Sequence, residues 1–253
     1  MSKKIISIDQ GTTSSRAVVF SDKGELIGFE QLEFKQFFPN DGWVEHDPEE
    51  IWLSVVEVLN LSIKRFNLSS SDIASIGITN QRETVVIWDK KTGKPIYNAI
   101  VWQDRRTSDF CDSLKGSQDL IQLKTGLTID PYFSASKVNW ILDQVNGARQ
   151  RAENGELLFG TIDSFLIWKL TEGRDHKTDV SNASRTMLYN IETNKWDEEL
   201  LSLFNIPSNL LPTVCDNAYD FGYTELLGGK VSIGGVAGDQ QSALIGQCCF
   251  EVG

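Results

Sequence analysis

The chain has 253 residues, 40% hydrophobic and 23% charged, a composition typical of a globular protein with a sizeable core. Its formal net charge of −11 argues against a nucleic-acid partner, because acidic side chains outnumber the basic ones that would neutralise a phosphate backbone. Its apolar runs are far shorter than a membrane span, and the run after Lys3 and Lys4 is too short for a signal peptide. We therefore expect a cytoplasmic protein with no membrane-spanning segment.

The cysteines indicate reduced thiols rather than a metal site. The four cysteines are not at metal-ligand spacing, and the sequence has only two histidines, His46 and His176. A zinc site is therefore not expected.

The first predicted element is a β-hairpin over residues 5–20. An apolar run ends at Asp9, a turn rich in hydroxyl groups follows, and a second β-branched run leads to Phe20. Gly11 is expected to give the turn its permissive backbone.

The turn of this hairpin has the chemistry of a phosphate site. Its backbone N–H groups and the hydroxyls of Thr12, Thr13 and Ser14 suit phosphate oxygens, and Arg16 would compensate their charge. Asp9 could hold a hydrated magnesium ion beside them. From the residue types alone, an ordinary hairpin whose hydroxyls satisfy their own turn remains an alternative.

A third strand is expected near residues 25–34, followed by a long helix. Asp47 is expected to cap this helix, Pro48 fits its first position, and Glu50 would complete a capping box. One face of the helix is apolar at helical spacing, which indicates that it covers a sheet. The residues of this face are Trp52, Val55, Val56, Leu59, Ile63 and Phe66.

The rest of the chain alternates between predicted strands and helices. Strands are expected at 73–79, 84–88 and 230–237, and helices at 137–145, 161–170 and 197–204. Gly234 and Gly235 within the last strand indicate a bulge or a close backbone approach. This order predicts an α/β fold with a mixed sheet flanked by helices.

Polar and aromatic residues gather after strands and in loops, where binding sites are common. They are Arg82 and Glu83 after the fourth strand, Trp102, and Tyr132. Taken singly, each also fits an ordinary structural role: a surface ion pair, a core aromatic and a loop plug.

A further candidate, Asp239, stands where a strand ends and a helix begins, followed by Gln240. A helix N-terminus stabilises an ionised carboxylate, as a catalytic base requires. A simple N-cap is the alternative interpretation of Asp239.

Together these motifs resemble the FGGY family of carbohydrate kinases, and within it the glycerol kinases. The resemblance rests on Asp-Gln-Gly-Thr-Thr-Ser-x-Arg at 9–16, Asn-Gln-Arg-Glu at 80–83, Val-Trp-Gln at 101–103, Asp-Pro-Tyr-Phe at 130–133 and Gly-Asp-Gln at 238–240. It extends over the whole chain. It implies a ribonuclease-H-like, actin-like ATPase domain.

The resemblance also implies roles for single residues. Asp239 would be the catalytic base. The residues implied to bind substrate are Arg82, Glu83, Trp102, Tyr132, Asp239 and Gln240. Those implied to bind the phosphates of ATP are Thr12, Thr13, Ser14 and Arg16, with Asp9 holding Mg²⁺.

The activity implied is ATP-dependent phosphorylation of glycerol to sn-glycerol 3-phosphate. Members of the family are roughly twice as long, two domains by the usual size of a domain. Residues 1–253 are therefore expected to be the N-terminal, glycerol-binding domain without the C-terminal nucleotide-binding domain. This chain is expected to be inactive alone and homo-oligomeric when full length. The alternatives are a xylulose or gluconate type of FGGY kinase, and a non-catalytic actin-like binding module.

Overall fold

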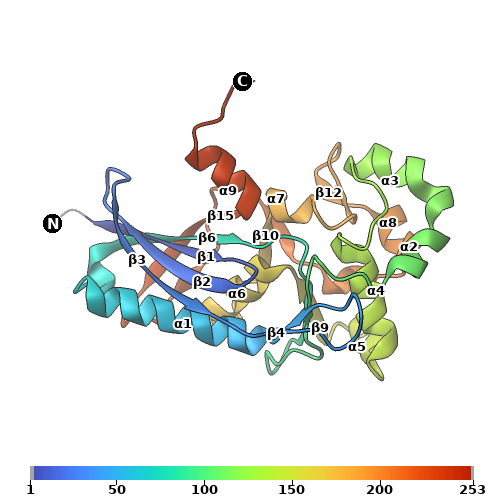
Figure 1. Cartoon of the computed structure of the whole chain (residues 1–253), viewed down its shortest axis with the longest axis horizontal. Coiled ribbons are helices and arrows are strands. Elements are labelled where there is room, and N and C mark those ends of the chain that lie inside the picture. The colour runs from blue at the N-terminus through green and yellow to red at the C-terminus, as the bar shows by residue number, and fades with distance from the viewer. Residues whose placement is uncertain (1–2, 252–253) are drawn as a thin grey trace.

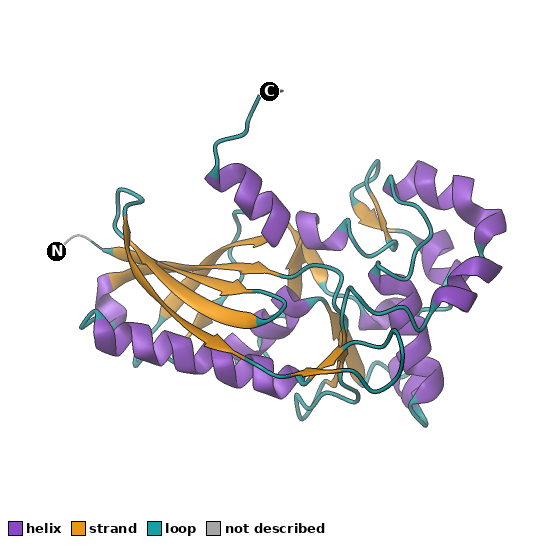
Figure 2. Ribbon diagram, in the orientation of Figure 1, coloured by secondary structure: helices purple, strands orange, loops and turns teal. Residues whose placement is uncertain are grey.

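The computed structural model of the protein describes residues 3–251 and is built around a six-stranded sheet with helices on both faces (Figures 1 and 2). The strand order is β14-β15-β6-β1-β2-β3. The bounds are β1 Lys4–Gln10, β2 Ser14–Phe20, β3 Leu26–Glu33, β6 Ile73–Asn80, β14 Tyr223–Thr224 and β15 Val231–Gly238. Strands β1, β2 and β3 pair antiparallel, whereas β6 is parallel to β1 and to β15. The predicted mixed sheet is confirmed.

The register of the three parallel strands determines where the polar motifs lie. Asp9 on β1 is paired with Thr79 on β6, and Asn80 at the end of β6 is paired with Gly238 at the end of β15. The carboxyl ends of parallel strands meet at one edge of a sheet, where ligands commonly bind. The segments that follow β1, β6 and β15 therefore converge at one edge.

The main core lies between the sheet and two helices on one face, α1 (Pro48–Arg65) and α6 (Ile162–Leu170). Ile6 and Ile8 of β1 are fully buried against these helices. Helix α9 (Asp239–Gly246) lies over the opposite face, above the sheet in Figure 1, whereas α1 runs below it. Among residues 3–251, no helix is both long and apolar enough to cross a membrane.

The start of α1 follows the sequence prediction with one correction. The side chain of Asp47 accepts a hydrogen bond from Glu49 N at 2.9 Å, and Pro48 is the first helical residue. Glu50 does not complete a capping box. Its Oε1 accepts from Lys35 N at 2.9 Å instead, which ties the helix to the segment after β3.

A second core lies in a mainly helical lobe beside the sheet, on the right in Figure 1. Its helices are α2 Ser108–Ser113, α3 Gln118–Thr125, α4 Ser134–Gln144, α5 Ala148–Glu153 and α8 Glu198–Leu203. The strand predicted at 84–88 is β7 (Val86–Asp89), which pairs with β9 (Leu157–Gly160) rather than with the main sheet.

Short elements complete the fold. They are β4 Gln36–Phe37, β5 Glu45–His46, β8 Ala99–Ile100, β10 Lys177–Asp179, α7 Val180–Ala183, β11 Tyr189–Asn190, β12 Lys195–Trp196 and β13 Thr213–Cys215, with 3₁₀ turns at Ser70–Asp72, Lys115–Ser117 and Ser208–Leu210.

The other predicted elements are present with shifted ends. Helix α4 begins three residues before the expected 137, and α6 and α8 begin one residue later than expected because Thr161 and Asp197 are their N-caps. The register of β15 against β6 is irregular between Ile233 and Gly235, which confirms the predicted bulge.

Candidate functional site

The candidate site is a small pocket at the sheet edge where β1, β6 and β15 end. Its cavity volume of about 110 Å³ is well below the roughly 300–1,000 Å³ of pockets that hold drug-sized ligands, which suits a small molecule and not a nucleotide. The residues that line it are Thr12, Arg82, Glu83, Trp102, Tyr132, Asp239 and Gln240. All six residues predicted to bind substrate therefore line one cavity.

Arg82, which follows β6, crosses the pocket toward α9. Its Nε lies 3.1 Å from Oδ1 of Asp239, and its Nη1 donates to Gln241 Oε1 at 3.3 Å. A Cβ on Gly238 would come within 2.5 Å of Arg82 Cδ, so only glycine permits this approach. The ion pair with Asp239 does not have hydrogen-bond geometry, and the buried Nε of Arg82 has no hydrogen-bond partner among the described residues. This N–H is buried and faces the Asp239 carboxylate.

Glu83 is held in a backbone conformation that is rare for its residue type. Its φ is +62°, in the left-handed region, and the residue is 1% exposed. The Ser134 hydroxyl donates to the Glu83 carbonyl at 3.0 Å, and Arg185 Nε donates to Glu83 Oε1 at 2.6 Å. Burial raises the pKa of Glu83, and the neighbouring cations oppose that rise. Such strain at a pocket wall is typical of functional sites.

Two aromatic side chains form the opposite wall. Trp102 and Tyr132 pack edge to face with ring centroids 5.5 Å apart. Trp102 Nε1 donates to Thr12 Oγ1 at 3.0 Å, and Asp130 Oδ1 accepts from Tyr132 N at 2.8 Å. Both rings are only partly buried, so Trp102 is not a core aromatic, which was the alternative interpretation of this residue. The wall offers an apolar surface beside polar groups.

Asp239 is the first residue of α9, and the N-cap is Gly238. The side chain of Asp239 is 40% exposed, and its Oδ1 accepts from Gln240 N at 2.7 Å. Asp239 is therefore not the N-cap, which was the alternative interpretation of this residue. Its carboxylate faces the pocket beside Arg82 and benefits from the N-terminal end of the helix.

The hairpin turn lies next to this pocket. Gly11 N donates to Ser14 O at 2.9 Å and closes the turn. Gly11 does not have a positive φ, so the expectation that it supplies an unusual backbone conformation was wrong. Thr12 is partly buried under Trp102, Thr13 is exposed, and Ser14 Oγ accepts from Gln31 Nε2 at 3.2 Å.

Asp9 and Arg16 face each other across β1 and β2, with Arg16 Nη1 3.6 Å from Asp9 Oδ2. Burial raises the pKa of Asp9, Arg16 opposes the rise, and the Asp239 charge adds to it. Asp9 offers one carboxylate, and Mg²⁺ takes one or two carboxylates and fills its shell with water and phosphate oxygens. Across residues 3–251, no group of three or more His, Cys, Asp or Glu side chains could hold a metal.

Comparison with known proteins agrees with the geometry. Residues 4–246 match the N-terminal domain of the FGGY family of carbohydrate kinases. The chain belongs to this family.

Several FGGY relatives are close in sequence. The chain is 58% identical to a glycerol kinase of Ectopseudomonas mendocina and 59% identical to glycerol kinase 1 of Pseudomonas aeruginosa, over 100% of its own length. It spans about half the length of these curated relatives, 52% in both cases. A crystal structure of Plasmodium falciparum glycerol kinase with ADP superposes with a TM-score of 0.94 at 38% identity, over 99% of this chain and 51% of that one.

More distant FGGY kinases share the fold. A ligand-bound xylulose kinase from Lactobacillus acidophilus superposes over 96% of this chain and 50% of its own, with a TM-score of 0.86 at 23% identity. These actin-like ATPase neighbours confirm the predicted fold class.

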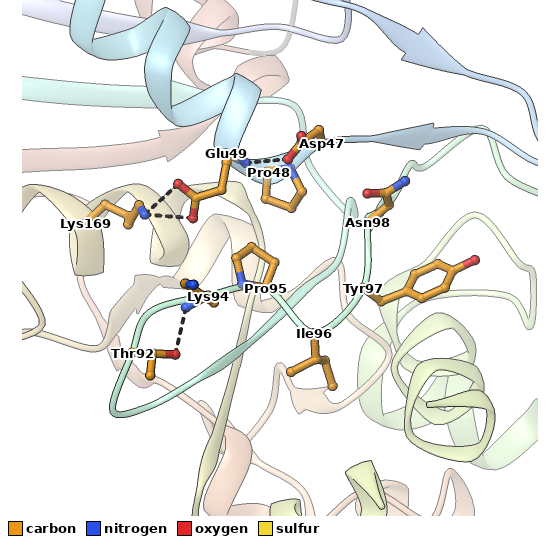
Figure 3. A pocket seen from close by; sticks show the side chains of 10 residues that line it. All are labelled: Asp47, Pro48, Glu49, Thr92, Lys94, Pro95, Ile96, Tyr97, Asn98 and Lys169. Atoms are coloured by element: carbon orange, nitrogen blue, oxygen red, sulfur yellow. Dashed lines mark hydrogen bonds and ion pairs between the residues drawn. The ribbon is translucent and has the colours of Figure 1, made fainter. Parts of the chain in front are cut away.

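A larger cavity of this FGGY domain, about 600 Å³, lies elsewhere (Figure 3). It is bounded by the start of α1, residues 92–98 and α6. Lys169 Nζ donates to both Glu49 oxygens at 2.8 and 2.9 Å, so these two charged groups satisfy each other. A binding site needs convergent polar groups as well as space, and these line the smaller pocket, so we assign the site there.

Sequence reasoning missed some residues that surround the pocket. Arg185 bonds the Glu83 side chain, Gln241 bonds the Arg82 side chain, and Ser134 bonds the Glu83 carbonyl. None of the three lines the cavity. Arg185 lies in a segment, 182–186, that resembles the family, but nothing in its spacing indicates that it reaches Glu83.

Proposed function

We propose that this chain is the N-terminal, glycerol-binding domain of an ATP-dependent kinase that converts glycerol to sn-glycerol 3-phosphate. The observation that carries the proposal is the small pocket in which Arg82, Glu83 and Asp239 face an aromatic wall. The family match and the names of the relatives at 58–59% identity support the same substrate.

The pocket suits a three-carbon triol. The guanidinium of Arg82 donates to a hydroxyl oxygen, and Glu83 and Asp239 accept from hydroxyl hydrogens. Trp102 and Tyr132 cover the C–H face of the molecule. An analogue that lacks a hydroxyl leaves one of these groups unpaired, and this is the basis of specificity.

Asp239 acts as the general base in this proposal. It orients the primary hydroxyl of glycerol and accepts its proton as the bond to the phosphoryl group forms. The N-terminal end of α9 and the guanidinium of Arg82 lie beside the carboxylate and interact favourably with its negative charge. Arg82 thereby serves both the base and the substrate.

The phosphates of ATP would lie along the turn at Thr12, Thr13 and Ser14, with Arg16 compensating their charge. Asp9 would hold Mg²⁺, which supplies neutralisation of the phosphate charge when bound. Because the relatives are about twice as long as this chain, we propose that the remaining half of such a kinase supplies the rest of the nucleotide site. This chain alone would bind ATP poorly and be inactive.

We also propose a cytoplasmic protein that is homo-oligomeric when full length. All four cysteines are free, as a reducing compartment favours.

Titration with glycerol, followed by NMR, tests the substrate. The indole N–H signal of Trp102, assigned with Trp102→Phe, should shift on addition of glycerol and much less on addition of xylulose or gluconate. A larger response to xylulose or gluconate would favour those kinase types. A response to none of the three would favour a non-catalytic module.

A second experiment tests the reaction. Joined to the second half of the Pseudomonas aeruginosa relative, the chain should release ADP in a glycerol-dependent manner. The chain alone should not.

A further inference from the structure

Arg185 lies outside the candidate pocket and contacts both its acidic wall, at Glu83, and its aromatic wall, at Tyr132. Its Nε donates to Glu83 Oε1 at 2.6 Å, the closest contact of that carboxylate with a cation. Its guanidinium carbon lies 4.9 Å from the ring centroid of Phe133 and 5.7 Å from that of Tyr132. One side chain, which does not line the cavity, therefore touches both the acidic and the aromatic wall.

Glu83 depends on this contact. A carboxylate that is 1% exposed is costly unless a cation or several donors compensate it. Arg82 is the other arginine nearby, but its Nε is 3.9 Å from Glu83 Oε1 and only 3.1 Å from Asp239. Arg185 is thus the direct partner of Glu83.

The second oxygen of Glu83 is the one left for a ligand. Among residues 3–251, no donor forms a hydrogen bond with Glu83 Oε2, and Glu83 lines the cavity. A guanidinium is planar and rigid, so a hydrogen bond from its Nε fixes the plane of the carboxylate as well as its position. Stacking on Tyr132 and Phe133 fixes the guanidinium in turn.

We propose that Arg185 is a positioning residue of the candidate glycerol site, which holds one oxygen of Glu83 so that the other meets a substrate hydroxyl. The inference rests on the proposed function. The inference adds one point to that function: discrimination between polyols depends on a residue that does not touch the substrate.

The charge of Arg185 also matters for the protonation of Glu83. Burial raises the pKa of Glu83, whereas Arg185, Arg82 and Lys137 of α4 lower it. Asp239 faces Arg82 and competes for its charge. Without Arg185 the pKa of Glu83 rises further, so the carboxyl group takes up a proton at a higher pH. A protonated Glu83 is a poorer acceptor for a hydroxyl group.

A double-mutant cycle tests whether Arg185 acts through Glu83. Glycerol affinity of the chain is measured by NMR titration for wild type, Arg185→Gln, Glu83→Gln and the double variant. Arg185→Gln should weaken binding about tenfold to hundredfold, the range for a hydrogen bond to a charged group. In the Glu83→Gln background the same change should cost no more than about twofold.

The matched control is Arg151→Gln. Arg151 pairs with Asp89 and Glu156 outside the pocket, and its side chain is 35% exposed against 24% for Arg185. This control should leave glycerol affinity unchanged. An equal loss for Arg185→Gln in both Glu83 backgrounds, or no loss in the wild-type background, would overturn the proposal.

A second measurement, of the protonation of Glu83, does not require glycerol. The ¹³C signal of the Glu83 carboxyl group, followed against pH, should titrate at higher pH in Arg185→Gln than in wild type. Arg185→Lys should restore the wild-type midpoint of this titration, but it should restore glycerol affinity only in part. An unchanged midpoint in Arg185→Gln would overturn the proposal.

Arg185→Lys provides the test if Arg185→Gln does not fold. The glycerol affinity of Arg185→Lys should then be lower than that of wild type, and full wild-type affinity would count against the inference. Failure of wild type to bind glycerol, with the Glu83 shift present, would reject the proposed function and leave the role of Arg185 supported.

Discussion

The guanidinium of Arg82 and the carboxylate of Asp239 meet at 3.1 Å between the end of β6 and the start of α9. Gly238 lies under this contact and has no side chain to obstruct it. The pairing of β6 with β15, which sets Asn80 beside Gly238, brings the two segments together. Substrate binding and base catalysis would therefore share one ion pair.

Replacement of Gly238 tests this arrangement. In Gly238→Ala the new Cβ would lie 2.5 Å from Arg82 Cδ and 2.7 Å from Cγ, so Arg82 must move. We expect a loss of glycerol affinity of about tenfold, the equivalent of one lost charged hydrogen bond. Gly246→Ala, at the other end of α9, adds a Cβ with no atom within 4 Å and should bind glycerol as wild type does. Wild-type affinity in Gly238→Ala would contradict the prediction.

Truncation of Trp102 tests the aromatic wall. Trp102→Ala should weaken glycerol binding because it removes the apolar surface and the hydrogen bond to Thr12. Trp102→Phe keeps a ring and should lose less affinity. Trp196→Phe is the control, since it removes an indole hydrogen bond to Pro212 in the other lobe. Glycerol affinity is measured by titration of the folded variants. If Trp102→Ala and Trp102→Phe bind glycerol as tightly as the control Trp196→Phe, Trp102 lies outside the substrate site.

The role of Asp239 is tested in a complete kinase that carries this chain as its first half. Asp239→Asn should bind glycerol within a few-fold of wild type and turn over ~10²–10⁴-fold more slowly, the usual effect of losing a positioned base. Asp112→Asn changes an exposed carboxylate that pairs with Lys115 and should be fully active. Near-normal turnover of Asp239→Asn would show that Asp239 is not the base.

A buried acid gives a prediction for the pH dependence of stability. Burial raises the pKa of Asp163 to about 7, and the charge of Asp179 adds to the rise. Between about pH 4 and about pH 7 the folded state holds a proton that the unfolded state has released. The free energy of unfolding should therefore fall as pH rises through this window, by an amount on the order of a few kcal/mol, and not fall further above it.

Asp163→Asn removes the group that binds this proton in the folded state. The new amide can still form hydrogen bonds with Thr161 and Thr178. Urea unfolding at several pH values should then give a flatter profile for the variant than for wild type. Asp109→Asn, at an exposed position in α2, should keep the wild-type profile. The same slope in Asp163→Asn as in wild type would assign the pH dependence to other groups.

Much of the fold could be predicted because local patterns are strong. The hairpin over 5–20, the capped helix after Asp47 and the bulge near Gly234 each follow from spacing and residue type over a few positions. The strand at 84–88 was predicted as a strand, but its pairing with β9 could not be, because partner choice depends on residues far along the chain. Helices α2, α3 and α5 of the second lobe were not predicted, because segments of 6 to 8 residues are too short to show a clear period.

The sequence by itself determined which residue types stand after β1, β6 and β15, and five of the seven residues that line the pocket are among them: Thr12, Arg82, Glu83, Asp239 and Gln240. The tertiary structure alone decided how they meet. Register places Asn80 beside Gly238, the missing Cβ of Gly238 admits Arg82, and the segment after α7 brings Arg185 to Glu83. A charged pair has its effect through a separation of a few ångströms in a dry environment, and one sequence does not encode that distance in any local pattern.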